Sequence, residues 1–245
     1  MYNYKIILEY EGTRYNGWQR QGNTPNTIQE ILEKTIGQIV GEKVEVNGSG
    51  RTDAGVHASG QVANFKTTKG FSTDFLIDSI NIALPSDIRI IKCEAVNERF
   101  HSRLNAREKT YIYNIDTSKK PNVFTRRTIQ HYPYNLDIDK MKRATTHLIG
   151  EKDFKAYTSN KRTKKSTVRT IYSIEIVEKG SEISIIYKGN GFLYNMVRIL
   201  TGTLLEVGTG KIKPEEIDNI TNSRDRAKAG PTVSPRGLVL FEVGY

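Results

Sequence analysis

The chain has 245 residues, with 37 Lys or Arg against 27 Asp or Glu, and a formal net charge of +10. This length suits one large domain or two of about 120 residues. The excess of positive charge favours a polyanion such as nucleic acid as partner, although a merely soluble basic protein is the alternative on charge alone. The single cysteine, Cys93, excludes internal disulfides and cysteine-rich zinc sites and predicts a reducing, cytoplasmic location. No apolar run reaches the roughly 18 residues of a membrane span, and no signal peptide is expected.

The first half predicts the element order β-α-β-β-α-β. Thr27 and Glu30 form a capping box before an amphipathic helix that Gly41 ends. Ser72 or Thr73 caps a second helix, which Pro85 stops. The expected elements are strand 4–10, helix 28–40, strands 44–49 and 61–67, helix 73–84 and strand 88–96. This order is the split βαβ or ferredoxin-like pattern.

The second half repeats that order without obvious residue identity. Its expected elements are strand 109–116, helix 138–149, a hairpin of strands 168–177 and 182–188, helix 193–207, a short helix from Pro214 and strand 238–243. The fold class is therefore predicted as α+β, with two ferredoxin-like halves, 1–106 and 107–245. Because the junction near 104–109 is short and polar, we expect two antiparallel sheets joined rigidly around a central cleft.

A glycine-containing loop between two of these strands holds one acid, Asp53, with Arg51 two residues before it. Glycines in the stretch 48–65 let the backbone turn sharply and approach a ligand closely. An Asp beside glycines in a loop is more often a turn residue that hydrogen-bonds its own backbone. The length of this loop and its place between two core strands favour the other interpretation, in which Asp53 is a nucleophile or a base.

Familiar cofactor and metal motifs are missing from the sequence. Gly189 and Gly191 lack the third glycine of a dinucleotide fingerprint, and Gly210-Lys211 does not complete a phosphate-binding loop. The four histidines show no metal-ligand spacing. Chemistry without a cofactor or a metal is therefore the simplest expectation.

Basic residues gather in loops, with aromatic residues interleaved elsewhere. Phosphate contacts and stacking surfaces are what recognition of structured RNA requires, whereas a single basic run is as often a solvated turn. Several such loops in one basic chain favour RNA. The expected RNA-binding residues are Arg14, Arg20, Lys161, Arg162, Lys164 and Lys165.

The string GRTDAGVHA at 50–58 resembles the signature loop of the TruA family of tRNA pseudouridine synthases. Further blocks, in the order of that family, extend the resemblance over essentially the whole chain. They begin at Tyr15 (YNGWQR), Phe100 (FHSR), Lys109 (KTYIY), His147 (HLIG), Val168 (VRTI) and Gly189 (GNGFLYNMVR). The resemblance implies two ferredoxin-like halves around a cleft, a homodimer, and isomerisation of uridines 38, 39 and 40 in the anticodon arm of tRNA.

The resemblance also implies roles for individual residues. Asp53 matches the nucleophilic aspartate, Tyr111 the tyrosine that packs on the target base, and Arg198 an arginine that pairs with the aspartate. Arg51 matches a loop arginine thought to help hold the flipped nucleotide, and Leu238 an apolar residue that lines the pocket. The chain departs from the family pattern at Leu104-Asn105 and at Val233-Ser-Pro. Both departures flank the predicted site, so they bear on substrate breadth more than on chemistry.

The chemistry and two competing functions stay open at this point. Asp53 could attack C1′, attack C6 of uracil, or remove the C2′ proton. A non-catalytic RNA-binding module is disfavoured because the strands lack the RNP1 aromatic string. A glycosidase is disfavoured because no second carboxylate lies in the Asp53 loop.

Overall fold

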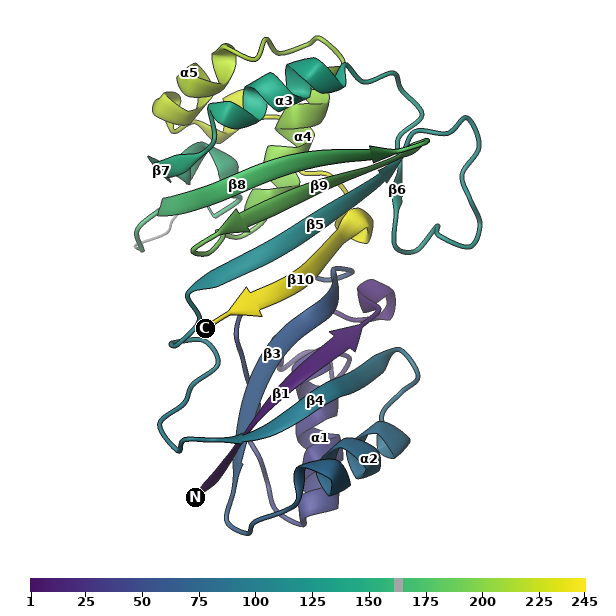
Figure 1. The fold of residues 1–245 in the computed structure, drawn as a ribbon, viewed down its shortest axis with the longest axis vertical. Helices are drawn as coiled ribbons and strands as arrows, with labels where there is room; N and C mark the ends of the chain where they lie inside the picture. Colours follow the sequence, from purple (N-terminus) through teal and green to yellow (C-terminus); the bar gives the residue numbers. More distant parts are fainter. Residues whose placement is uncertain (161–164) are drawn as a thin grey trace. The chain divides into compact units, whose positions relative to one another are not determined.

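The computed structural model describes residues 1–160 and 165–245. Its contacts divide the chain into two compact units, one formed by Met1–Arg107 with Val239–Tyr245 and the other by Glu108–Leu238. Each unit combines a β-sheet with helices (Figure 1), so the predicted α+β class is confirmed.

The sheet of the first unit has the order β4-β1-β3, with antiparallel neighbours. The short β2 pairs with β3 on its other side, and β10 joins β3 in parallel through Val239 and Leu240. Apolar residues of the sheet and of α1, such as Ile6, Leu8 and Leu32, are fully buried. The elements are β1 (Tyr2–Tyr10), a 3-10 turn (Gly12–Arg14), α1 (Ile28–Val40), β2 (Asn47–Gly48), β3 (His57–Thr67), α2 (Thr73–Ala83), β4 (Ile88–Val96) and β10 (Leu238–Gly244).

Helix α1 begins and ends as the capping residues predict. The Thr27 side chain accepts a hydrogen bond from the backbone N–H of Glu30, and Gly41 ends the helix in the left-handed conformation at φ 74°. The buried face of α1 is not purely apolar, however, because it includes Gln29 and Glu33 beside the apolar residues. Two buried polar side chains one turn apart on a helix need hydrogen-bond partners.

Those partners explain why the predicted strand 44–49 is wrong in its first part. Val44 and Val46 are buried as their alternation predicts, but only Asn47–Gly48 forms a strand. The N–H of Val46 donates to the Glu33 carboxylate, and its carbonyl accepts from the Gln29 amide. Helix side chains thus occupy the backbone groups of Val46 that a sheet neighbour would otherwise bind.

The sheet of the second unit has the order β7-β8-β9-β5, with antiparallel neighbours, and the short β6 lies parallel to β5. Helix α4 packs against α3 and is buried along most of its length. Figure 1 shows the helices of this unit gathered on one side of its strands. The elements are β5 (Glu108–Asp116), β6 (Gln130–His131), α3 (Ile138–Thr146), β7 (Gly150–Asp153), β8 (Val168–Lys179), β9 (Glu182–Gly189), α4 (Met196–Gly208) and α5 (Glu216–Ser223), with 3-10 turns at Phe154–Tyr157, Arg226–Lys228 and Pro235–Gly237.

The ends of the elements in this unit differ from the expectation where local geometry intervenes. The helix predicted from 193 begins at Met196, because Asn195 before it has a left-handed backbone with φ 60°. Helix α3 ends at Thr146, with His147 as its C-cap, and the polar strand β7 that follows has no alternation to reveal it. Among the described residues, no helix has both the length and the apolarity to cross a membrane.

Candidate active site

The loop that carries Asp53 joins β2 to β3 and is fastened at its start by Gln61. The Gln61 amide donates to the carbonyl of Gly50 at 3.1 Å, and its side-chain oxygen accepts from the Ser49 hydroxyl at 2.7 Å. Ser49 and Gln61 are fully buried. The backbone then turns at residues 53–56, where the N–H of Val56 donates to the carbonyl of Asp53 at 3.1 Å. Asp53 itself is half-buried in this turn.

Thr52 anchors the residue immediately before Asp53. Its hydroxyl lies 2.8 Å from the hydroxyl of Tyr10 on β1, and its carbonyl accepts from the N–H of Trp18 at 3.0 Å. Thr52 is 6% exposed and Tyr10 is 4% exposed, so both bonds lie within the core. Burial raises the pKa of Tyr10 to about 12 despite its bond to Thr52, which keeps the phenol neutral as a fixed anchor.

The segment 11–20 supports the loop from outside. The N–H of Gly55 donates to the carbonyl of Tyr15, and the N–H of Gly12 donates to Nδ1 of His57 at 2.9 Å. Gly17 has φ +88°, and a Cβ there would lie 2.6 Å from the carbonyl oxygen of Thr52. Only glycine tolerates both that conformation and that approach. The YNGWQR string thus has a physical reason, because its backbone cradles the Asp53 turn.

Three acids of the first unit contact the arginines of this segment. Asp87, in the turn before β4, receives the Nε of Arg14 at 2.8 Å and the hydroxyl of Tyr15 at 2.5 Å. Arg20 contacts Glu33 at 2.7 Å through its terminal nitrogen, while its Nε lies 3.7 Å from Glu30. Both arginines therefore tie the supporting segment to the rest of the unit. Their predicted contact with RNA stays a prediction.

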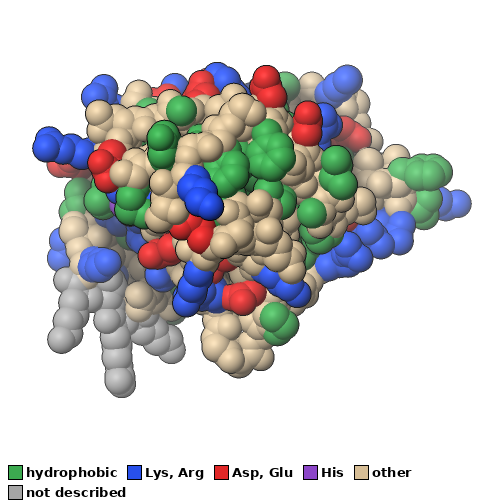
Figure 2. All heavy atoms as spheres, turned by 90° about the horizontal axis from the view of Figure 1, so that it is seen from below, with side chains coloured by type: hydrophobic (Ala, Val, Ile, Leu, Met, Phe, Trp, Pro, Cys, Tyr) green, Lys and Arg blue, Asp and Glu red, His purple; other side chains and the backbone are tan. Residues whose placement is uncertain are grey.

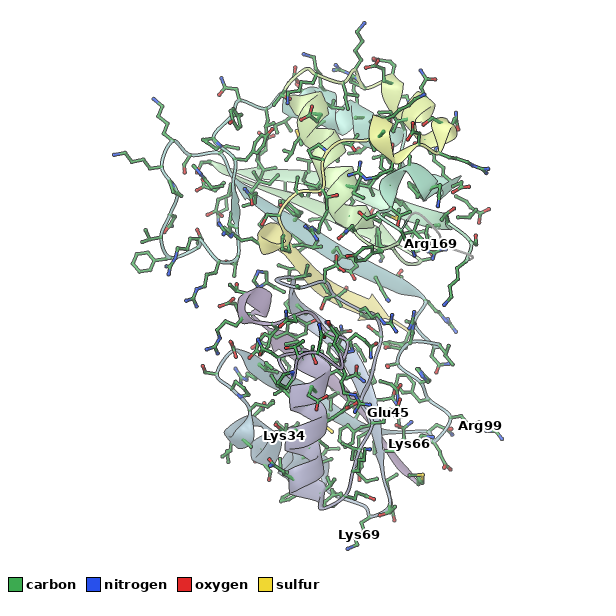
Figure 3. The ribbon with its side chains drawn as sticks, turned by 180° about the vertical axis from the view of Figure 1, so that it is seen from behind. Lys34, Glu45, Lys66, Lys69, Arg99 and Arg169 are labelled. Carbon is green, nitrogen blue, oxygen red and sulfur yellow. The ribbon has the colours of Figure 1, made fainter. Side chains whose placement is uncertain are left out.

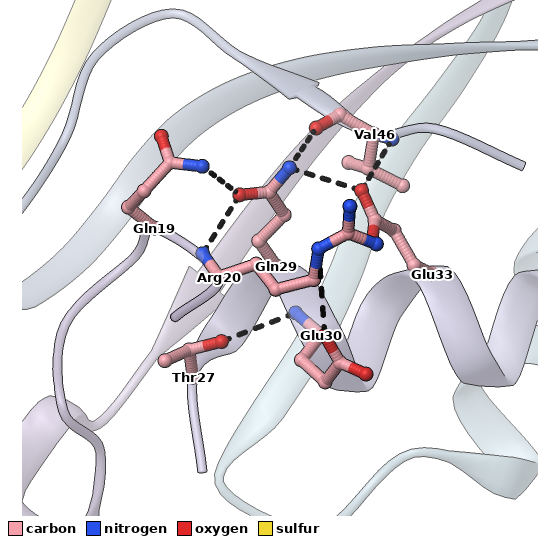
Figure 4. Close-up of polar contacts among 7 residues, drawn as sticks. All are labelled: Gln19, Arg20, Thr27, Gln29, Glu30, Glu33 and Val46. Atoms are coloured by element: carbon pink, nitrogen blue, oxygen red, sulfur yellow. Dashed lines mark hydrogen bonds and ion pairs between the residues drawn. The ribbon is translucent and has the colours of Figure 1, made fainter. Parts of the chain in front are cut away.

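A chain of side-chain hydrogen bonds links Arg51 to the interior of the unit. Figure 4 shows the part of this chain from Gln19 through Gln29 to Glu33 and Val46. Arg51 donates its Nε to the oxygen of Gln19 at 2.8 Å, and the Gln19 amide donates to the Gln29 oxygen at 2.6 Å. That oxygen also accepts from the N–H of Arg20 at 2.9 Å. The Gln29 amide then donates to Glu33 at 2.9 Å and to the carbonyl of Val46 at 3.1 Å.

Gln29 stands at the centre of this network, and sequence analysis did not single it out. Both hydrogens and the oxygen of its amide are used, and its side chain is nearly buried, with the residue 8% exposed. The available signal was the pair Gln29 and Glu33, one turn apart in a helix otherwise apolar on that side. Because Gln29 and Glu33 are buried, the hydrogen-bonded chain that ends at the Arg51 side chain starts from a fixed point in the core.

The second unit holds Tyr111, Arg198 and Leu238. Tyr111 on β5 is 8% exposed and packs edge-to-face on Phe192, with ring centroids 5.3 Å apart. Arg198, in the first turn of α4, donates to the carbonyl of Val233 at 2.7 Å and to the side chain of Asn195 at 2.9 Å. Leu238 is 5% exposed at the start of β10.

The segment 233–238 fixes these residues within the second unit. Besides the bond from Arg198 to Val233, the carbonyl of Ser234 accepts the hydroxyl of Tyr113 at 2.8 Å, two residues along β5 from Tyr111. Burial raises the pKa of Tyr113, so its phenol stays neutral as a donor. The Val233-Ser-Pro departure from the family pattern therefore lies where the chain holds Arg198 and β5.

The remaining predicted RNA contacts precede β8 in the sequence. Lys165 is exposed, whereas Lys161, Arg162 and Lys164 lie outside the described residues. Among residues 1–160 and 165–245, no group of His, Cys, Asp and Glu is arranged to hold a metal ion.

Comparison with known proteins assigns this arrangement to a class of enzyme. The family model described as tRNA pseudouridine synthase matches residues 6–105 and 144–245. Proteins named tRNA pseudouridine synthase A from Bacillus sp. (strain KSM-64) and Thermoanaerobacter sp. (strain X514) are 46% and 44% identical over 245 residues, which is 100% of this chain and of each relative. One from Acetivibrio thermocellus is 44% identical over the same length. A chain titled as part of a Cbf5-Nop10-Gar1 complex aligns with a TM-score of 0.40 and 14% identity, covering 83% of this chain and 45% of that one.

These matches span both units, so the chain belongs to the tRNA pseudouridine synthase family. It is therefore an isomerase that converts uridine to pseudouridine in tRNA, and the enzyme predicted from the signature loop is confirmed. The alternative of a non-catalytic RNA-binding module is excluded by the same matches.

Proposed function

We propose that the substrate uridines are positions 38, 39 and 40 of the anticodon stem-loop and that Asp53 carries the chemistry. The observation that carries the proposal is the construction of the Asp53 turn. Hydrogen bonds from β1, from Gln61 and from the segment 11–20 hold the loop on both sides of this carboxylate. A carboxylate held in one orientation by its neighbours does not have to be oriented during the reaction. This lowers the activation barrier.

The proposed reaction needs no added atoms. The N1–C1′ glycosidic bond of uridine breaks, the base turns, and C5 bonds to C1′. The proton at C5 is released to solvent and N1 takes up a proton, so uridine and pseudouridine have the same composition. An ionised Asp53 serves as the nucleophile at C1′ or C6, or as the base at C2′. In the proposed assembly the positive charge of Arg198 favours the ionised carboxylate, the ring of Tyr111 packs on the base and Leu238 lines the pocket. Arg51 holds the flipped nucleotide, whose extrusion from a stem costs a few kcal/mol.

Three further properties belong to the same proposal. The enzyme acts as a homodimer, in the cytoplasm, and each half, 1–106 and 107–245, is a ferredoxin-like copy. The strand order β4-β1-β3-β2 in the first unit supports the last point, since it is the order of a split βαβ sheet. The free thiol of Cys93 suits a reducing compartment. Sedimentation of the free protein at twice its 27.8 kDa mass is the expected result for the dimer, and sedimentation as a monomer would contradict it.

The test of Asp53 uses an anticodon-arm RNA labelled with tritium at C5 of uridine. The Asp53→Ala variant should bind this RNA with nearly unchanged affinity and release no tritium, because the scaffold remains while the reacting group is lost. Asp78→Ala is the matched control, since Asp78 is exposed on α2 and should leave both measurements unchanged. Undiminished tritium release by Asp53→Ala would rule out Asp53 as the catalytic residue. Tritium release by the unchanged enzyme only from uridines outside 38–40 would contradict the proposed positions.

A further inference from the structure

The loop between β5 and β6, residues 117–129, forms an arm with an unusual composition. It contains Lys119, Lys120, Arg126 and Arg127 and no acidic residue. All four cations are exposed. In Figure 1 the arm is the long excursion that leaves the second unit beside β6. In Figure 2 it projects at the right of the view, with Lys and Arg side chains along it and hydrophobic side chains at its end.

The end of the arm is apolar and almost fully exposed. Phe124 is 94% exposed and Val123 is 61% exposed. Singly exposed apolar residues are common, but a phenyl ring held in water at the tip of a cationic loop gains nothing from its own fold. Its side chain contributes no burial to the second unit, so an explanation has to come from something outside it.

Hydrogen bonds within the arm hold this tip in a defined conformation. The N–H of Phe124 donates to the side chain of Asn122 at 2.9 Å, and Arg126 donates to the carbonyl of Val123 at 2.9 Å. The N–H groups of Thr128 and Ile129 both donate to the carbonyl of Thr125. A tip that is ordered before binding loses less conformational entropy when a partner arrives.

The base of the arm is fixed as well. Asp116, 6% exposed at the end of β5, accepts the N–H of Ser118 at 2.9 Å, and His131 of β6 lies 2.8 Å from the carbonyl of Ser118. Burial opposes ionisation of Asp116, but the bonds from Ser118 and the nearby His131 outweigh it and lower the pKa of the carboxyl. The hydroxyl of Ser118 in turn donates to the carbonyl of Lys120 at 2.7 Å. The cations and the ring are therefore presented from a rigid base.

We propose that residues 117–129 are an RNA-binding arm on which Phe124 stacks against an unpaired base of the tRNA while the flanking cations contact phosphates. The proposal rests on tRNA being the substrate. Cations without acids attract a polyanion, and an exposed aromatic face binds an unstacked base whatever its identity. Since Tyr111 is the residue proposed to pack on the target uridine, the proposal assigns to Phe124 a different base of the tRNA.

The first test replaces the ring and keeps the arm. In Phe124→Ala the backbone bond to Asn122 remains and no core packing is lost, so the fold should be unchanged. Stacking on one base predicts an increase of about fivefold or more in the Kd and KM for full-length tRNA, with kcat unchanged. Phe124→Trp should restore the affinity. Phe75→Ala is the matched control, because Phe75 is an aromatic residue 46% exposed on α2 beside Asp74 and Asp78, where RNA is repelled.

The second test removes charge from the arm. Lys119→Ala with Lys120→Ala should weaken tRNA binding and reduce the slope of log K against log salt by roughly 1 to 2, as expected for one or two lost phosphate contacts. The control removes the same charge from the first unit through Lys34→Ala with Lys69→Ala. Figure 3 labels both lysines, which are exposed. Among the described residues, neither lysine side chain makes a hydrogen bond or an ion pair.

Three results would overturn the proposal. One is a tRNA affinity of Phe124→Ala within twofold of the unchanged protein. Another is an equal loss of affinity in the Lys34 and Lys69 control, which would show a general effect of charge. The third is unchanged tRNA binding together with lost binding to phosphatidylglycerol vesicles, which would make the arm a membrane contact. None of these results changes the outcome of the tritium-release test of Asp53. The proposal of an RNA-binding arm and the proposal that Asp53 is catalytic can therefore be refuted separately.

Discussion

At the scale of single residues, Gln29 shows how a buried amide can position a loop that it does not touch. Its oxygen receives Gln19 and the backbone of Arg20, and its nitrogen binds Glu33 and Val46. Gln19 in turn receives Arg51. A methionine of similar size would keep the packing and remove every one of the Gln29 bonds. Replacement of Gln29 by methionine therefore tests the hydrogen bonds of Gln29 separately from its packing in the core.

We expect Gln29→Met to lower the free energy of unfolding by about 1–3 kcal/mol, because buried partners such as the Val46 carbonyl lose a hydrogen bond. We also expect it to lower kcat more than it raises KM for tRNA, since Arg51 and the loop lose their fixed support while the basic surface is unchanged. Denaturant unfolding and single-turnover tritium release measure the two effects.

Gln38→Met on the same helix is the control for Gln29→Met, because Gln38 is exposed and should leave both quantities within experimental error. A Gln29→Met protein with lowered stability but an unchanged kcat would show that the network is structural only. Recovery of kcat in Gln29→Glu would instead show that one acceptor oxygen toward Gln19 is sufficient.

At the scale of elements, local signals predicted helices better than the segments that join them. The caps of α1 at Thr27 and Gly41 are confirmed because a cap satisfies backbone groups within a few residues. The strand expected from Val44 is wrong in its first part because Glu33 and Gln29 bind the backbone of Val46. That competition depends on a contact between a helix and the segment that follows it, and periodicity carries no information about such contacts.

Helices α3 and α5 of the second unit are joined by a polar contact with a predictable pH dependence. His147, which caps α3, lies 2.6 Å from Asp218 on α5, and Lys152 of β7 lies 3.6 Å from the same carboxylate. The bond from His147 is the largest cause that lowers the pKa of Asp218. A folded-state pKa below the unfolded value of about 3.9 stabilises the fold above that pH, and the stabilisation is lost as pH falls through the folded pKa.

Asp218→Asn should therefore be less stable than the unchanged protein at pH 7, by at most about 1 kcal/mol because the side chain of Asp218 is 46% exposed and the pair is screened by solvent. The difference should shrink below about pH 4 and vanish once Asp218 is protonated in both folded and unfolded chains. Urea unfolding at pH 7, 4 and 3 measures it. Asp78→Asn, exposed on α2, should show no such trend, and a difference constant with pH would contradict the assigned cause.

At the scale of the whole molecule, the predicted function depended on blocks distributed along the entire chain. Net charge indicated a polyanion, but no spacing rule connects Asp53 with Tyr111 or Arg198, which lie in different units. The resemblance named these residues. The structure adds the physical reason for the strings around them, such as Gly17 against Thr52 and Val233 against Arg198. Residues like Gln29 and Asp87 act through other side chains, so neither charge nor motif revealed them.

The net charge of +10 makes a prediction that belongs to the molecule as a whole. If binding neutralises six or more phosphates, the affinity for tRNA should fall by about a thousandfold between 50 and 200 mM salt, because bound counterions are released from the RNA. The kcat at saturating tRNA should stay constant, because salt weakens the binding of tRNA and saturation restores the fully bound enzyme. Filter binding and initial rates over this range measure both quantities, with unfolding at each salt concentration as the control for stability. An affinity that does not change with salt would show that stacking and shape, rather than the basic surface, hold the tRNA.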